Sequence, residues 1–369
     1  MQKSIDHYDV LHSMKQRAIG RLRRLHLAYL WGLLALSRFS LLETAAQGML
    51  PCSVSYAARH WAAIPLQTGY LAPDRARLTG QSGAVYLVVD FTPVRHGGAT
   101  IQGVDQVWST SEKRCVTAHQ YTSSAYIHPY RAHDPIPADL RPRISPALAT
   151  ERVPFQSTLE VMKTQYHAAR QGGVGIKAVV VDAEFTTKPN LAQSLEQRLP
   201  VLGRVQKRLK VLWEEQSLRL DQLASHWPRA RCSPYPALGW RAKRLEIDLP
   251  EVGAVQVLIV WHQQGADWKV FFLISTVQDA TVFELLRVWK RRWQVEVLHR
   301  LYKQNFNLAA CPVRHYAHHA RHALLVLEGY LLARGQRERD PSLTWRQASG
   351  RAVLELRSCV LIDAQGLAA

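Results

Sequence analysis

Two aspartates stand at the ends of apolar, β-branched runs of the sequence. Residues 84–89 (AVYLVV) lead into Asp90, and residues 175–181 (GIKAVVV) lead into Asp182. Continuous runs of this kind predict strands that are buried on both faces of a sheet. A carboxylate at the end of such a strand lies where the core opens to solvent, which is where open α/β sheets bind ligands. Because Asp also commonly terminates strands, either residue alone favours a structural role, and only the pair indicates a site.

A third carboxylate, Glu296, lies in a predicted helix further along the chain. It belongs to a set of residues separated by three, four and seven positions, which places them near one face of a helix: Trp289, Arg292, Glu296 and Lys303. Arg292 and Arg300 are each four residues from Glu296, which is the spacing of helical ion pairs. An ion-paired, solvated helix surface is the alternative explanation. The position of this set downstream of two strand-end aspartates favours a functional site.

The chain of 369 residues is strongly basic. It has 47 Lys and Arg against 29 Asp and Glu, a formal charge of +18, which favours a polyanionic partner, nucleic acid before a membrane surface. A hydrophobic share of 47% excludes a disordered or fibrous chain. The longest apolar run, residues 26–37, is shorter than the ~20 residues that span a bilayer, so we expect a soluble protein without a membrane partner. Five scattered cysteines without a C-x-x-C pair favour a reducing, cytoplasmic compartment.

Apolar residues recur at helical spacing over about residues 6–63, so the N-terminal region 1–79 is predicted to be helical. Five basic residues crowd into ten positions of it: Lys15, Arg17, Arg21, Arg23 and Arg24. Such a run is commonly a solvated face, but in a chain of this charge it indicates contact with a phosphate backbone. We therefore expect an N-terminal helical, DNA-binding region.

The remainder of the chain alternates between strand and helix patterns. Three strand-like stretches predict an antiparallel meander, and they lie at 84–90, 102–108 and 115–121. The proline-rich residues 129–146 predict a connector with little secondary structure. A helix, strand, helix and strand follow, at 150–171, 175–182, 190–198 and 201–205. Residues 204–275 favour strands, and two helices at 281–304 and 313–334 precede a weakly structured tail.

The set around Glu296 resembles the Y-x2-R-x3-E-x6-K signature of insertion-sequence DDE transposases of the insertion-sequence-4-type group. The segment WKRRWQVE (289–296) together with Lys303 carries the resemblance, with Asp90 in LVVDF and Asp182 in VVDAEF. It covers roughly residues 80–334. The signature tyrosine is Trp289 here, and an indole N–H cannot place a donor where a phenol hydroxyl would. We expect this replacement to affect contacts with the DNA end, or the rate of the reaction, more than it affects metal binding.

The resemblance implies an α/β chain with an RNase H-like catalytic domain interrupted by a β-strand-rich insertion, and with the N-terminal helical DNA-binding region. The implied division is 80–203 and 276–335 for the two parts of the catalytic core, 204–275 for the insertion, and 336–369 for a C-terminal tail. The order of elements expected from the residues alone agrees with this arrangement.

The resemblance also implies an enzyme that cuts the terminal inverted repeats of its element and joins the 3′-OH ends to target DNA. The implied catalytic residues and metal ligands are Asp90, Asp182 and Glu296. Oxygen ligands can hold two Mg²⁺ ions about 3.5–4 Å apart to stabilise the attacking and leaving oxygens of a phosphodiester, and Mn²⁺ can substitute. The implied DNA-binding residues are Trp289, Arg292, Arg300 and Lys303. The implied partner is double-stranded DNA, bound by a homodimer in the bacterial cytoplasm and nucleoid.

Two rival functions remain open. One is a catalytically degenerate, transposase-derived DNA-binding protein. The replacement of the signature tyrosine by Trp289 is compatible with this function, whereas the presence of all three acids argues against it. The other is an RNase H-like, metal-dependent nuclease without strand transfer. Asp105, which no apolar run precedes, is a weaker substitute for Asp90.

For two further patterns we favour an explanation that needs no zinc site and no special contact with a DNA base. A stripe of potential zinc ligands, namely Cys311, His315, His318, His319 and His322, has helical spacing. Histidines near DNA can equally bind phosphates, and we expect no zinc site there. Any tryptophan of 204–275 could stack on an unpaired base, although core packing is the favoured role for each one: Trp213, Trp227, Trp240, Trp261 and Trp268.

Overall fold

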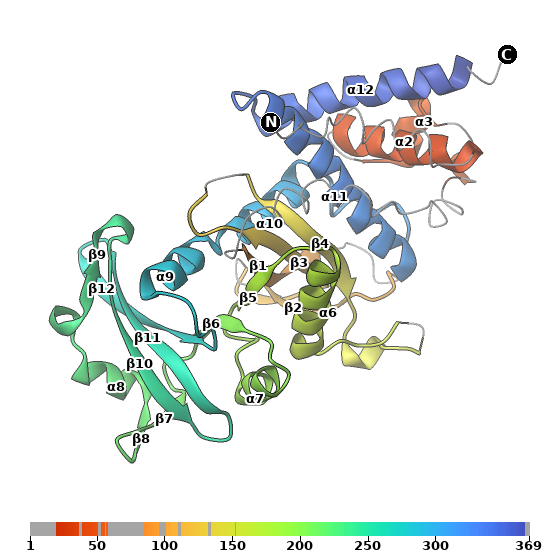
Figure 1. The fold of residues 1–369 in the computed structure, drawn as a ribbon. Coiled ribbons are helices and arrows are strands. Elements are labelled where there is room, and N and C mark those ends of the chain that lie inside the picture. The colour runs from red at the N-terminus through yellow and green to blue at the C-terminus, as the bar shows by residue number, and fades with distance from the viewer. Residues whose placement is uncertain are drawn as a thin grey trace.

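The structure is a computed structural model that describes residues 20–36, 39–50, 53–55, 57, 85–95, 101–109, 112–131, 134–151 and 153–365. Its fold is mixed α/β, as expected (Figure 1). The strands that surround the two aspartates are β1 (Val85–Arg95), β2 (Asp105–Ser109), β3 (Arg114–Ile127), β4 (Ile136–Arg143), β5 (Ile176–Val181) and β6 (Val201–Val205).

These strands form one end of a twelve-stranded sheet that runs through the described part of the chain. β1 lies in the middle of these six strands, antiparallel to β3 on one side and parallel to β5 on the other. β3 also pairs with β2 and β4, and β5 pairs in parallel with β6. The resulting order β4-β3-β1-β5-β6 is consistent with an RNase H-like fold of the DDE type.

Two expectations for this part of the sheet were wrong. The three predicted strands do not form a simple meander, because β3 lies between β1 and β2. The proline-rich connector contains β4, which pairs with β3 despite Pro137 and Pro142. Proline lacks a backbone N–H, but a strand that bonds a neighbour on one side alone tolerates that loss.

Alternate residues of β1 face two different cores. Val85, Leu87 and Val89 pack with helix α6 (Thr158–Gln171) on one face of the sheet. Tyr86 and Val88 pack on the other face with helix α9 (Val282–Arg291). Because side chains alternate along a strand, Asp90 continues the set that faces α9.

The crossover between β5 and β6 is helical, as the sequence predicts. It contains α7 (Lys188–Glu196), and the preceding α6 begins at a capping box in which Ser157 and Glu160 bond each other's backbone N–H groups. α6 begins later than expected, since the residues described between 150 and 157 are not helical. Right-handed βαβ units of this kind bring the ends of parallel strands to one edge of a sheet.

Apart from residues 204–205, which belong to β6, the predicted β-rich segment 204–275 extends the same sheet. It contains β7 (Lys210–Trp213), β8 (Gln216–Arg219), α8 (Leu220–His226), β9 (Ser233–Tyr235), β10 (Trp240–Leu249), β11 (Gly253–Gln264) and β12 (Asp267–Ser275). β12 pairs antiparallel with β6, and the order continues β12-β11-β10-β7-β8, so strand hydrogen bonds join this segment to the rest (Figure 1). The predicted richness in strands is confirmed.

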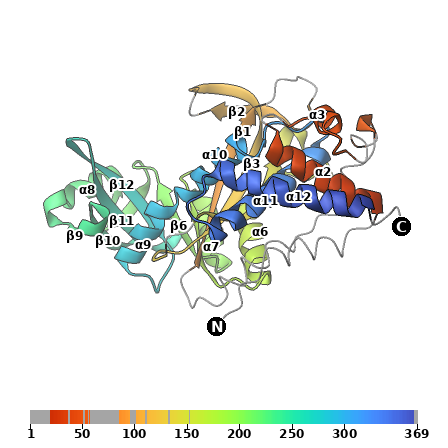
Figure 2. The same ribbon diagram turned by 90° about the horizontal axis from the view of Figure 1, so that it is seen from above.

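Helices from both ends of the described chain lie together at one side of the molecule (Figure 2). They are α2 (Gly20–Ala35), α3 (Leu41–Ala46), α11 (Tyr316–Arg339) and α12 (Trp345–Gln365). α2 packs against α11 and α12, and their apolar faces share one core. The expected weakly structured tail is instead the helix α12, because Ala348, Ala352 and Leu356 recur at helical spacing and are buried in that core. No helix among the described residues is both long and apolar enough to cross a lipid bilayer.

The N-terminal basic run is only partly within the structure. Lys15 and Arg17 lie outside the described residues, whereas Arg21, Arg23 and Arg24 fall in α2. The helical expectation is confirmed for residues 20–35 and 41–46, which are separate helices and not one.

The helix predicted over residues 281–304 is two helices. α9 ends at Arg291, Arg292 and Trp293 form a turn, and α10 (Gln294–Gln304) follows. Neither turn residue is Gly or Pro, so the local sequence does not mark the break. α9 covers the face of the sheet around Tyr86, whereas α10 packs on β1 and β3.

Candidate active site

Parallel pairing of β1 with β5 brings two aspartates to neighbouring positions. Val88 lies opposite Val180, and the same register continued by two residues places Asp90 beside Asp182. Neighbouring strands are about 4.8 Å apart, so the two residues are adjacent. Asp182 follows the last residue of β5 as expected, but β1 continues past Asp90 to Arg95, so Asp90 is an interior strand residue.

Local hydrogen bonds fix both carboxylates in similar ways. Asp90 Oδ1 accepts a bond from the backbone N–H of Phe91 at 2.9 Å, and Asp182 Oδ1 accepts one from Ala183 at 2.9 Å. Each bond uses one oxygen and leaves the carboxylate with further acceptor capacity.

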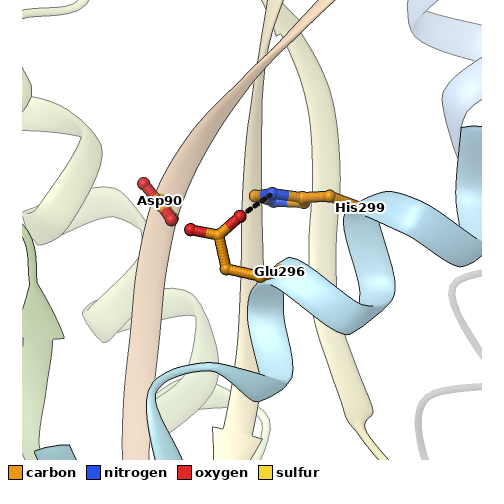
Figure 3. Close-up of side chains that lie close together, drawn as sticks. All are labelled: Asp90, Glu296 and His299. Carbon is orange, nitrogen blue, oxygen red and sulfur yellow. Dashed lines mark ion pairs between the residues drawn. The ribbon is translucent and has the colours of Figure 1, made fainter. Parts of the chain in front are cut away.

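Glu296 approaches the same place from α10. Figure 3 shows its carboxylate between Asp90, on β1, and a ring that projects from one turn further along the helix. Arg292 lies at the turn between α9 and α10, with Nη1 3.2 Å from Asp90 Oδ2 and 4.0 Å from Glu296 Oε1. The predicted pairing of Arg292 with Glu296 is therefore present. Arg300 is exposed, and within the described chain no ion pair joins it to Glu296.

The acids perturb one another. The pKa of Asp90 is raised to about 7, chiefly by burial and also by the nearby carboxylates of Glu296 and Asp182, against the opposing effect of Arg292. One guanidinium thus stands among three carboxylates, two of which it contacts. A cation that bound between the acids would relieve this repulsion, because it favours their ionised forms.

Lys303 is held against the same strand. Its Nζ donates a 2.7 Å hydrogen bond to Oγ1 of Thr92, which is two residues beyond Asp90 on β1 and therefore on the same face. Burial lowers the pKa of Lys303, and the Glu296 carboxylate partly offsets that effect. The fourth residue of the predicted set therefore lies beside the acids.

Trp289, on α9, packs against the site and does not enter the acidic group. Its ring lies 6.4 Å from that of Phe271, between centroids, and the guanidinium carbon of Arg292 lies 5.0 Å from the Trp289 ring centroid. This contact fixes the orientation of Arg292 by a cation–π interaction. An aromatic ring at this position therefore helps to position Arg292, which contacts two of the acids.

His299 is a site residue that the sequence reasoning missed. It is buried, and its Nδ1 lies 3.9 Å from Glu296 Oε2 (Figure 3). Burial lowers its pKa to about 3, with smaller contributions from Lys303 and Arg292, so the ring is neutral. The spacing Glu-x-x-His, which puts both side chains on one helix face, was the available signal.

The residues present fit a divalent cation. One potential ligand atom each from Asp90, Glu296 and His299 lies within 4.8 Å of the others. Carboxylate oxygen and neutral imidazole nitrogen are both ligands of divalent metals in proteins. Asp182 is outside this trio but lies beside Asp90 through the strand register.

The other sequence candidates lie elsewhere. Asp105 is exposed on β2, opposite Ala118. Cys311 and His315 precede α11, whereas His318, His319 and His322 belong to α11, the last two with buried side chains. All five tryptophans of 204–275 are partly buried, and four of them pack against core clusters. The fifth, Trp268, lies 4.8 Å from the guanidinium carbon of Arg229.

Comparison with known proteins gives one positive result. A model of the DDE superfamily endonuclease family matches residues 23–237, which is more than half of the chain. The match includes Asp90 and Asp182 and ends before Glu296. A search of curated proteins found no match. The chain therefore belongs to the DDE superfamily endonuclease family.

Proposed function

We propose that this protein is a DNA transposase of an insertion sequence. Membership of the DDE endonuclease family supports nuclease-type or transposase-type chemistry on DNA. The observation that carries the finer proposal is the meeting of Asp90 and Glu296 at the guanidinium of Arg292, with Asp182 brought beside Asp90 by the register of β1 and β5. The enzyme cuts the ends of its element and joins the 3′-OH ends to target DNA.

In this proposal Asp90, Asp182 and Glu296 are the catalytic residues and metal ligands. Two Mg²⁺ ions held there would activate the attacking hydroxyl and stabilise the departing oxygen, with Mn²⁺ as a substitute. Asp90 belongs to both pairs of acids, with Asp182 along the sheet and with Glu296 across to the helix. It would therefore be the residue that both metal ions share.

The cations beside the acids bind DNA phosphates. Arg292 presents a planar fork that suits a phosphate, and Lys303 is held on the same face of β1 by Thr92. Arg300 is exposed one turn beyond Glu296, and Trp289 holds Arg292 in place. The overall charge of +18 extends this attraction to the DNA backbone.

We also propose a domain organisation and an oligomeric state for this protein. The chain would be of the insertion-sequence-4 type, with 204–275 as an insertion in an RNase H-like core and 1–79 as a DNA-binding region. It would bind the two element ends as a homodimer in the bacterial cytoplasm, because joining two ends requires two active sites.

The direct test uses a duplex that carries the DNA flanking the gene, once inverted repeats and short target duplications have been identified there. Asp90→Asn and Glu296→Gln should each lower Mg²⁺-dependent cleavage of that duplex by at least about a thousandfold. DNA affinity should persist, because each change removes negative charge close to phosphate. Glu246→Gln, which alters an exposed carboxylate on β10, is the matched control and should cleave normally.

The outcomes separate the three functions. Cleavage that survives Asp90→Asn and Glu296→Gln would refute the assignment of the site. Binding without any cleavage by the unaltered protein would indicate a degenerate DNA-binding protein. Cleavage without joining of labelled 3′ ends to a plasmid would indicate a nuclease that lacks strand transfer.

A further inference from the structure

We propose that His299 is a ligand of the metal ion that Asp90 and Glu296 hold, so that this ion has mixed nitrogen and oxygen coordination. The inference rests on the proposed function, because it concerns one of the two metal positions assigned there. It adds a fourth residue to the three acids of the metal site. It also implies a preference for one divalent metal over another, which the acids alone would not give.

The distances suit three ligands of one ion. His299 Nδ1 lies 3.9 Å from Glu296 Oε2, and the ligand atoms of the trio all lie within 4.8 Å of one another. Two ligands that are each about 2.1 Å from a metal are about 3 Å apart at a right angle and about 4 Å apart at wider angles. A shift of up to about 1 Å would therefore bring these atoms onto a common ion.

The helix presents both side chains to the same place. Glu296 and His299 are three residues apart on α10, and Figure 3 shows the His299 ring directed toward the Glu296 carboxylate, with Asp90 beyond it. The Glu-x-x-His pattern at this spacing supplies metal ligands in helical carboxylate proteins. Here β1 supplies the second carboxylate in place of another helix.

No protein group uses the nitrogens of His299 among the residues that the structure describes. Nε2 is buried without a hydrogen-bond partner, and Nδ1 is too far from Glu296 for a hydrogen bond. Nδ1, the nitrogen that faces the acids, is therefore available to coordinate a metal ion, and Nε2 would carry the proton of the neutral ring.

The ligand set has consequences for metal choice and charge. Carboxylate oxygens suit Mg²⁺ and Mn²⁺ alike, whereas an imidazole nitrogen favours the softer transition metals, so Mn²⁺ gains more from His299 than Mg²⁺ does. The ring is a neutral ligand. It completes the site without adding a negative charge that would repel the DNA phosphate.

The test uses the whole, unaltered protein loaded with Mn²⁺. Electron spin-echo spectroscopy detects a nitrogen bound directly to Mn²⁺, and selective [¹⁵N]histidine labelling changes that signal without altering the structure. We expect a histidine nitrogen coupling that the label changes, and we expect Asp90→Asn to remove both the coupling and the bound Mn²⁺. Bound Mn²⁺ that depends on Asp90 but lacks this coupling would overturn the inference while leaving the proposed metal site intact.

A substitution then identifies the residue. His299→Gln should weaken Mn²⁺ binding, measured by calorimetry, by about tenfold or more, and should weaken Mg²⁺ binding less. His226→Gln is the matched control, because His226 is exposed on α8. Equal Mn²⁺ affinity in the two variants would overturn the inference. Absence of any Mn²⁺ binding that depends on Asp90 would instead refute the proposed function, and this inference with it.

Discussion

Two clusters of polar side chains lie in different layers of this molecule, a largely buried one between helices and a partly buried one between the sheet and α10. The helical cluster consists of His26 and Tyr29 on α2, Glu328 and His322 on α11, and Asn307 between α10 and α11. His26 Nε2 lies 2.7 Å from Glu328 Oε1. Every one of these groups has a protein partner at hydrogen-bond distance.

The bonds of His322 illustrate this arrangement. Burial lowers its pKa to about 4, so the ring is neutral. Its Nε2–H donates to the carbonyl oxygen of Asn307 at 2.9 Å, since a carbonyl can only accept, and its Nδ1 accepts from the Tyr29 hydroxyl at 2.7 Å. Both nitrogens are satisfied, and the ring joins an N-terminal helix to a C-terminal one.

The acidic cluster, which consists of Asp90, Asp182, Glu296, Arg292 and His299, is arranged differently. Three carboxylates share the field of one guanidinium, and a neutral histidine beside them has no hydrogen bond to any described residue. The helical cluster is complete in the protein alone, whereas the acidic cluster needs a cation to balance it. This contrast distinguishes polar groups that stabilise the fold from polar groups that are arranged to bind a ligand.

Breaking the helical cluster should have the largest effect on stability. Glu328→Ala leaves His26 buried without its partner, and we expect a loss of about 3–5 kcal/mol in the free energy of unfolding, measured with urea at pH 7. Glu355→Ala is the control, since its pair with Arg339 is exposed and should contribute no more than about 1 kcal/mol. Equal losses in the two variants would contradict the structural role of the buried pair.

Neutralising the acidic cluster should act in the opposite direction. The pKa of Asp90 is raised in the folded protein, to about 7, so the metal-free protein loses stability as pH rises from about 4 to 7. Asp90→Asn removes that loss, and we expect a gain of about 2–4 kcal/mol at pH 8 in EDTA, which shrinks toward zero near pH 4. A destabilised Asp90→Asn protein at pH 8 would show that Asp90 is part of the framework and not a strained ligand.

His322 should give a pH dependence of the reverse sign. Its pKa is lowered in the folded protein, to about 4, so the unfolded chain takes up the proton and stability falls as pH drops from about 6.5 to 4. His322→Gln lacks this titration. Its destabilisation relative to the unaltered protein should therefore be largest at pH 7 and about 2–3 kcal/mol smaller at pH 4, by urea denaturation. A constant difference across this range would contradict a neutral, fully bonded ring.

The parts of the acidic cluster differ in how far the sequence predicts them. Asp90 and Asp182 follow buried β-branched runs, and parallel pairing in register then makes them neighbours. Glu296 needed the resemblance as well, because its approach to β1 depends on the turn at Arg292, where no glycine or proline marks a break. His299 was missed because its role arises only once β1 is placed opposite α10.

The helices and strands also differ in how far the sequence predicts them. Strands with long apolar runs, such as β1 and β5, and the βαβ unit after them were predicted from pattern alone. β4 was missed because its prolines are tolerated only at its place in the sheet, and α12 because its apolar face is narrow. In each case the missing information was the partner element, which local sequence does not specify.

The smallest expected effect concerns Trp289, which stands where the transposase signature that the sequence resembles has a tyrosine. Its ring holds Arg292 by a cation–π contact of about 0.5–1 kcal/mol, so a tyrosine, which keeps an aromatic face, should preserve most of this positioning. We expect Trp289→Tyr to retain DNA cleavage within about twofold and Trp289→Leu to lower kcat/KM about two- to fivefold, with unfolding measured in parallel to exclude a packing defect. If both variants lost activity equally, the aromatic face would not be what orients Arg292. The single cation of the acidic cluster would then be fixed by Asp90 and Glu296 alone, and the acids would determine its position as they determine that of a metal.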